Sequence, residues 1–123
     1  MAGMDRRWRS WYLRVLPAYW VFLFCATHFP RLQLDNAPPQ SDKLLHFTAF
    51  GVLAFLFWRF FEAVGAVGPL YVWLALPVLI LYAAIDEYLQ QFVGRSTDWA
   101  DFVADSIGIC VVLAAMEIRR RMK

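Results

Sequence analysis

Four apolar stretches with no Asp, Glu, Lys or Arg alternate with shorter polar segments along the chain. They cover residues 15–30, 44–58, 63–85 and 106–116. Only 63–85 by itself reaches the roughly 20 apolar residues that one membrane crossing needs. The other three reach that length with their flanking residues, because charged side chains at helix ends can extend to the lipid surface. We therefore predict helices over about 11–30, 43–61, 66–91 and 98–118.

These helices are expected to form one all-α domain over residues 1–123, an integral membrane four-helix bundle. The composition agrees, because 61% of the residues are hydrophobic and 18% are aromatic, more than in an ordinary soluble domain. A soluble helical bundle is the alternative, but its helices should show a polar face every three to four residues. The stretch 63–85 has no such face. Cys25 and Cys110 lie in apolar stretches and imply no disulfide.

The charged residues divide between the two sides of the expected membrane. With four crossings both termini lie on one side, and that side carries nine of the 12 Lys and Arg residues. Because Lys and Arg are enriched on the cytoplasmic side, we expect cytoplasmic termini. The basic residues sit at membrane boundaries, so no nucleic-acid partner is expected. Most acidic residues fall at or near the other side: Asp35, Asp42, Asp86, Glu87, Asp98, Asp101 and Asp105.

Several polar residues on this outer side share helix faces. The i, i+3 and i+4 spacings that place residues on one face link Asp98 with Asp101 and Asp105, Asp42 with His46, and Asp86 with Gln90. Counting 1.5 Å per residue from the inner boundary places Asp105 about 12 Å and His46 about 10 Å below the outer surface. Charged side chains are costly in lipid, so these faces should turn toward one another. The sequence thus predicts an outward-opening polar pocket.

Structural roles compete with functional ones for these residues. Ser41 or Asp42 can cap the second helix and Asp98 the fourth. His46 can bond a backbone carbonyl, and Asp105 can form an ion pair with Arg95. Because Asp105 lies a full turn past any cap, a functional role is favoured for it.

Two segments resemble the VanZ-like membrane proteins. Residues 42–50 place a Lys and a His before aromatic residues, and residues 86–95 lead to Asp101, Asp105 and Gly108; from its first to its last residue the resemblance spans about half the chain. Relatives often carry a Pro before the Gly-Arg pair, where this chain has Val93, and Asn where it has Asp105. The resemblance implies a small four-helix protein of the bacterial inner membrane. The founding member of that family is associated with reduced susceptibility to the glycopeptide teicoplanin.

The favoured function is acid–base chemistry at the outer leaflet on a lipid-linked or cell-envelope substrate. Imidazole and carboxylate groups are common proton-transfer groups in enzymes, and the candidates are His46, Asp86, Glu87, Asp101 and Asp105. Lys and Arg can hold a phosphate group, so the candidates for substrate binding are Lys43, Gln90 and Arg95. The same carboxylates and imidazole can hold a divalent cation, although no ligand spacing requires one.

Two non-catalytic functions use the same residues. The protein can bind or shield an envelope component or a glycopeptide, or it can be a structural partner in a larger membrane complex, with polar residues that lock helix packing. A nucleophile would favour an enzyme, but none of the candidate hydroxyl groups lies in a recognised nucleophile motif: Ser41, Ser96, Thr97 and Ser106. The sequence leaves catalysis, substrate and oligomeric state open.

Overall fold

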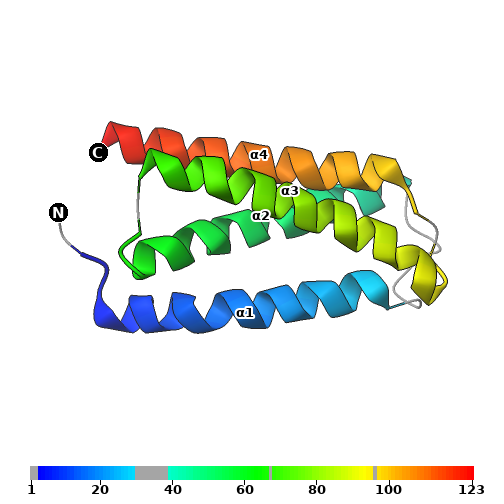
Figure 1. The fold of residues 1–123 in the computed structure, drawn as a ribbon, viewed down its shortest axis with the longest axis horizontal. Coiled ribbons are helices and arrows are strands. Elements are labelled where there is room, and N and C mark those ends of the chain that lie inside the picture. The colour runs from blue at the N-terminus through cyan, green and yellow to red at the C-terminus, as the bar shows by residue number, and fades with distance from the viewer. Residues whose placement is uncertain (1–2, 30–38, 67, 96) are drawn as a thin grey trace.

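The computed structural model describes residues 3–29, 39–66, 68–95 and 97–123, which form four long helices lying side by side (Figure 1). Within these ranges the chain forms helices and no strand, which confirms the all-α prediction. A short 3-10 helix, η2, follows the third long helix. The bounds are α1 Arg6–His28, α2 Pro39–Ala63, α3 Pro69–Gln90, η2 Gln91–Val93 and α4 Trp99–Met122.

The helix ends differ by a few residues from the predicted ranges. α2 and α3 begin at Pro39 and Pro69, because the first turn of a helix tolerates a residue without a backbone N–H. α4 continues past 118 to Met122 through three arginines, which interact favourably with the carboxyl end of a helix. Four residues used in the sequence predictions lie outside the described ranges: Pro30, Arg31, Asp35 and Ser96.

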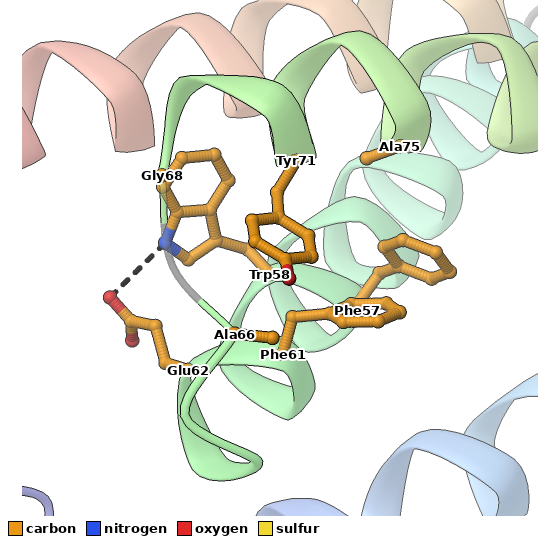
Figure 2. A pocket seen from close by; sticks show the side chains of 8 residues that line it. All are labelled: Phe57, Trp58, Phe61, Glu62, Ala66, Gly68, Tyr71 and Ala75. Carbon is orange, nitrogen blue, oxygen red and sulfur yellow. Dashed lines mark hydrogen bonds between the residues drawn. The ribbon is translucent and has the colours of Figure 1, made fainter.

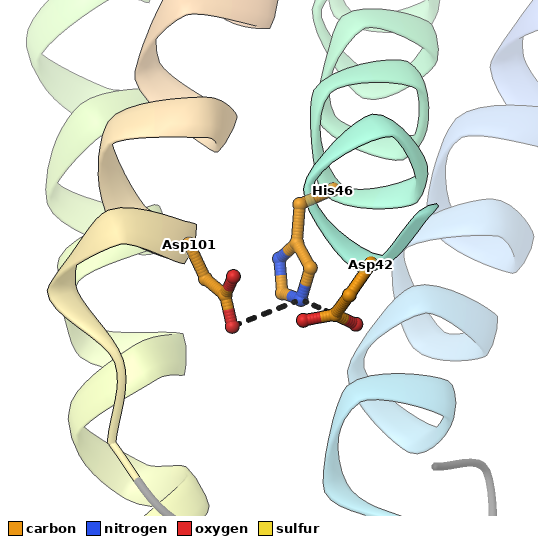
Figure 3. Close-up of side chains that lie close together, drawn as sticks. All are labelled: Asp42, His46 and Asp101. Carbon is orange, nitrogen blue, oxygen red and sulfur yellow. Dashed lines mark ion pairs between the residues drawn. The ribbon is translucent and has the colours of Figure 1, made fainter. Parts of the chain in front are cut away.

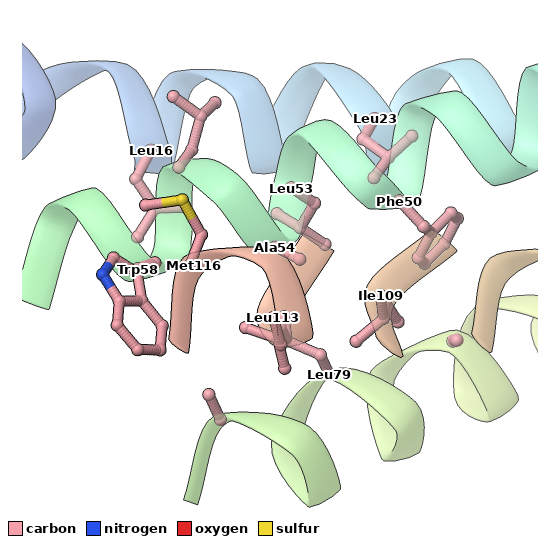
Figure 4. Close-up of a cluster of buried hydrophobic side chains, with 13 residues drawn as sticks. Leu16, Leu23, Phe50, Leu53, Ala54, Trp58, Leu79, Ile109, Leu113 and Met116 are labelled. Atoms are coloured by element: carbon pink, nitrogen blue, oxygen red, sulfur yellow. The ribbon is translucent and has the colours of Figure 1, made fainter. Parts of the chain in front are cut away.

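An apolar core runs along the inside of the bundle (Figure 4). Phe50 of α2, Leu79 of α3 and Ile109 of α4 have no exposed surface. Leu16 and Leu23 bring α1 into the same cluster. Each helix thus contributes an apolar face to one continuous core.

Two glycines allow the most extensive helix contact, between α2 and α4. A Cβ atom added at Gly108 would overlap the backbone carbonyl oxygen of Phe47, so the two backbones touch at this point. At Gly51 an added Cβ would lie 3.3 Å from Cγ2 of Val112, a side-chain atom. Small residues at helix interfaces permit such close approach. Because Asp105 lies one helical turn before Gly108, the contact also sets how closely Asp105 approaches α2.

Two of the described helical segments are long and apolar enough to cross a membrane. They are Ser41–Ala63 and Leu70–Val93, with mean hydropathies of 1.7 and 1.6. α1 and α4 do not meet the same criterion, and both carry several charged residues. By length and composition, therefore, two of the four predicted crossings are supported.

α1 begins and α4 ends at the same end of the bundle, beside the α2–α3 connection (Figure 1). Glu117 accepts hydrogen bonds here from Arg120 at 2.8 and 2.7 Å and from Arg121 at 2.7 Å. A small apolar pocket lies at this end, between the end of α2 and the start of α3 (Figure 2), and its aromatic lining residues are Phe57, Trp58, Phe61 and Tyr71.

We predict that Gly108→Ala destabilises the fold more than Gly51→Ala does. Overpacking a core typically costs about 1–3 kcal/mol, and more where no atom can move aside. The new methyl group at residue 108 would meet backbone, whereas at residue 51 only the tip of Val112 must yield. Thermal unfolding of both variants in detergent, followed by circular dichroism, measures the difference. Equal melting temperatures for the two variants would show that the backbones do not touch at Gly108.

Candidate functional site

Polar side chains, most of them buried, gather at the end of the bundle opposite the termini, where α2 and α4 begin and α3 ends. One group lies on α2 and α4, and we call it the histidine cluster: Asp42, Lys43, His46, Asp101 and Asp105. A neighbouring group joins α1 to α3, and we call it the Asp86 network: Thr27, His28, Tyr82, Asp86 and Gln90.

His46 lies at the centre of the histidine cluster with only 7% of its surface exposed. Its Nδ1 lies 2.8 Å from Oδ1 of Asp105, a hydrogen bond that joins α2 to α4. Asp105 has no exposed surface. A carboxylate only accepts hydrogen bonds, so it selects the form of the ring that carries a proton on Nδ1. When the ring is neutral, Nε2 then presents its lone pair.

The second ring nitrogen of His46 faces two carboxylates (Figure 3). Nε2 lies 3.7 Å from Oδ2 of Asp101 and 3.9 Å from Oδ1 of Asp42. Both separations are longer than a hydrogen bond. The Asp101 side chain is buried, whereas that of Asp42 is 52% exposed, so the cluster opens to the surroundings beside Asp42.

Lys43 joins the start of α2 to the start of α4. Its Nζ donates to Oδ1 of Asp101 at 2.9 Å and to Oδ2 of Asp98 at 3.0 Å. Oδ1 of Asp98 accepts from the backbone N–H of Ala100 at 2.9 Å, which confirms that Asp98 caps α4. The hydrogen bonds from Lys43 and from that amide hold the pKa of the Asp98 carboxyl below its usual range. Ser41 and Asp42 both lie inside α2 and do not precede it, so the capping role predicted for one or the other is wrong.

Glu87 extends the polar region from the histidine cluster to α3. It has no exposed surface, and its Oε1 accepts from the backbone N–H of Asp98 at 2.7 Å. One ligand atom each of His46, Glu87 and Asp105 lie within 4.8 Å of one another. Oδ2 of Asp105 is buried and has no hydrogen-bond partner in the described chain. One buried carboxylate oxygen in this region therefore lacks a hydrogen-bond partner among the described residues.

Asp86 faces α1, although it is the neighbour of Glu87 in sequence. Its Oδ1 accepts from Thr27 at 2.8 Å and from Tyr82 at 3.3 Å, and its Oδ2 accepts from Gln90 at 3.3 Å. Arg95 also contacts α1, where it donates to the backbone carbonyl of Thr27 at 2.6 Å. The predicted site residues thus fall into two adjacent groups, with Asp86, Gln90 and Arg95 outside the histidine cluster.

Sequence reasoning missed Thr27 and Tyr82 as members of a polar network. Tyr82 lies four residues before Asp86, an i, i+4 spacing that could have identified it. Thr27 lies on another helix, and nothing in its local sequence indicates its partner. The predicted structural ion pair between Asp105 and Arg95 is wrong, because Asp105 bonds His46 while Arg95 bonds the Thr27 carbonyl.

The histidine cluster combines groups that can transfer protons and hold an anion. An imidazole held at one nitrogen by a carboxylate and open at the other is suited to general acid–base chemistry. Lys43, whose side chain is 41% exposed, adds a positive charge beside the opening. One imidazole surrounded by carboxylates is also a ligand set for divalent cations.

Comparison with known protein families gives a match over nearly the whole chain. The sequence model of the family described as VanZ/LLP1 matches residues 5–120, a range that includes both polar groups. Comparisons with curated proteins and with solved structures found no match. The family match confirms the resemblance expected from residues 42–50 and 86–95. The chain belongs to the VanZ/LLP1 family.

Proposed function

We propose that this chain is a multi-pass protein of the bacterial inner membrane whose histidine cluster catalyses acid–base chemistry on a lipid-linked or cell-envelope substrate. The observation that carries the proposal is the arrangement at His46. One ring nitrogen is bonded to the buried carboxylate of Asp105, and the other faces the open side of the cluster.

The outer surface of the bundle supports a position within a bilayer. Many large apolar side chains are more than half exposed on all four helices, among them Phe22 at 65%, Leu44 at 65%, Trp73 at 73% and Ile118 at 59%. Contiguous exposed apolar surface of this kind is rare on soluble monomers and typical of surfaces that meet lipid or a partner. α1 and α4 cross together with the two more apolar helices.

The distribution of basic residues supports cytoplasmic termini. α1 starts with two arginines and α4 finishes with three before Met122, and these helix ends lie at the same end of the bundle (Figure 1). The positive-inside rule assigns that end to the cytoplasm. The histidine cluster, at the opposite end, then opens at the outer leaflet, where lipid-linked envelope components are within reach.

The residues of the histidine cluster have distinct roles in the proposed chemistry. Asp105 holds the Nδ1 proton and fixes the ring, so that Nε2 can take a proton from water or a substrate hydroxyl. Lys43 binds an anionic part of the substrate, such as a phosphate, as a compact positive charge. Asp101 holds the Lys43 ammonium group through a hydrogen bond.

A structural role suits Asp86, Gln90 and Arg95 better than catalysis. Asp86 and Arg95 are bonded to Thr27 of α1. Gln90 donates to Asp86 and, at 3.4 Å, to Glu87 on its own helix. Interhelical hydrogen bonds between polar side chains stabilise helix association in membranes. We therefore assign these three residues to the attachment of α1, which corresponds to the helix-locking alternative for this part of the polar region.

We predict that a cysteine at Gln91 is accessible from outside the cell and that one at Met122 is not. Both positions are exposed, and the variants are made in a chain whose Cys25 and Cys110 are replaced by alanine. An impermeant thiol reagent should label Gln91→Cys in intact cells and Met122→Cys only after permeabilisation. The reverse pattern would place the histidine cluster on the cytoplasmic side.

We predict that Asp105→Asn keeps most activity and that Asp105→Leu loses it. An Asn oxygen can accept the hydrogen bond from His46, whereas Leu cannot. General acid–base groups typically contribute about 10²–10⁴-fold to rate, so Asp105→Leu and His46→Gln should each slow turnover by at least about 100-fold. The assay is turnover of a radiolabelled envelope-lipid extract by the purified protein.

Membrane insertion and circular dichroism of the same variants provide the control for folding. A folded Asp105→Leu variant with wild-type turnover would remove Asp105 from the mechanism. Failure of the wild-type protein to turn over any labelled lipid would contradict the catalytic proposal and favour a binding or shielding role.

A further inference from the structure

We propose that Asp42, His46 and Asp101 bind a divalent transition-metal cation at the opening of the histidine cluster. The ligand atoms are Nε2 of the imidazole and one oxygen of each carboxylate, and all three lie within 4.8 Å of one another. The inference rests on the proposed function for the role of the ion at the outer leaflet. With the ion bound, Nε2 of His46 would be a ligand, so water held by the ion would take the place of Nε2 as the base. Binding itself is measured without turnover.

The separations between the ligand atoms fit an ion placed between them. Zinc, for example, lies about 2.0–2.2 Å from nitrogen and oxygen ligands in tetrahedral geometry, which places two of its ligands roughly 3.3–3.6 Å apart. The three side chains would therefore move by only a few tenths of an ångström to close around it. Nε2 of His46 lies 3.7 Å from Asp101 Oδ2 and 3.9 Å from Asp42 Oδ1 (Figure 3). A mixed set of imidazole and carboxylate ligands suits Zn²⁺ or Mn²⁺.

The unpaired nitrogen of a buried histidine is the second observation that points to a cation. His46 is more than nine-tenths buried, and across the described residues its Nε2 makes no hydrogen bond. A proton on Nε2 would draw a carboxylate to about 2.7–2.9 Å, the length of a charge-assisted hydrogen bond. Both observed gaps are longer by almost 1 Å or more. A cation bound in this gap would supply the positive charge that the two facing carboxylates attract.

The neighbouring side chains hold these ligands as a metal site requires. Metal-binding histidines usually donate their other ring N–H to a carboxylate or carbonyl, which orients the ring. Asp105 provides that carboxylate for Nδ1 at 2.8 Å and acts as a positioning residue. Lys43 binds Oδ1 of Asp101 at 2.9 Å, which leaves Oδ2 of Asp101 for the ion.

A buried alternative for the ion uses His46, Glu87 and Asp105, whose ligand atoms are equally close. Oδ2 of Asp105, buried without a hydrogen-bond partner in the described chain, favours that position, but an ion on Nδ1 of His46 would replace the bond from Nδ1 to Asp105. Glu87 Oε1 is also occupied by the backbone N–H of Asp98. The position at Asp42 keeps both bonds and leaves coordination sites of the ion open toward the exposed side, where water or an anionic substrate can bind.

Titration of the purified, tag-free, full-length protein in detergent tests the proposal directly. After treatment with EDTA, Zn²⁺ and Mn²⁺ are added in separate calorimetric titrations. We expect one ion per chain, with at least about tenfold weaker binding in Asp42→Asn, His46→Gln and Asp101→Asn. Asp98→Asn is the matched control, because it removes a nearby carboxylate that is not a ligand while Asn still caps the helix. Its affinity should equal that of the wild type.

Absence of binding of either ion by the wild type would overturn the proposal, and so would unchanged affinity in both Asp42→Asn and Asp101→Asn. Loss of binding in Glu87→Gln, with binding kept in Asp42→Asn and Asp101→Asn, would also overturn it, because that result identifies the buried position. Circular dichroism verifies the fold of each variant. Metal binding without lipid turnover would support this inference and contradict only the proposed function. Lipid turnover without metal binding would contradict this inference and support the proposed function.

Discussion

The hydrogen bond between His46 and Asp105 links the packing of the bundle to its chemistry. It joins two buried side chains on α2 and α4, and it depends on the backbone contact at Gly108 one turn further along α4. Removal of either partner would leave the other buried and unpaired, at a cost of about 1–3 kcal/mol. The same bond fixes the ring so that Nε2 faces Asp42 and Asp101. Helix packing, ring orientation and the open side of the site therefore depend on one contact.

Several carboxylates lie in the interior of the bundle, and each has a different set of hydrogen-bond partners. Asp86 accepts from Thr27, which attaches α1 to α3, and from Tyr82 and Gln90 of its own helix. Glu87 is bonded to the backbone at the start of α4. The remaining carboxylates surround His46, where Lys43 and His46 are the only basic side chains that the described residues place in contact with them. This group has an open side beside Asp42, and it is the one to which we assign chemistry.

More of the fold than of the candidate site could be predicted from the sequence. The long apolar stretches predict the helices. The i, i+3 and i+4 spacings place Asp101 with Asp105 on one helix face and Asp42 with His46 on another. The division of the polar residues could not be predicted, because it depends on the rotation of α3 about its axis. Successive helical residues point about 100° apart, so Asp86 faces α1 while Glu87 faces α4. Membrane orientation and catalysis remain predictions, since they depend on a bilayer and a substrate.

The protonation of the His46 ring tests the central claim most directly. The chain has two histidines, so ¹⁵N-labelled histidine in a His28→Gln variant reports on His46 alone. The account predicts that Nδ1 carries a proton and that its resonance shifts in Asp105→Leu, because the hydrogen bond to the carboxylate is lost. A ring protonated at Nε2 alone, with a spectrum unchanged by Asp105→Leu, would contradict the arrangement on which both the fold and the proposed chemistry depend.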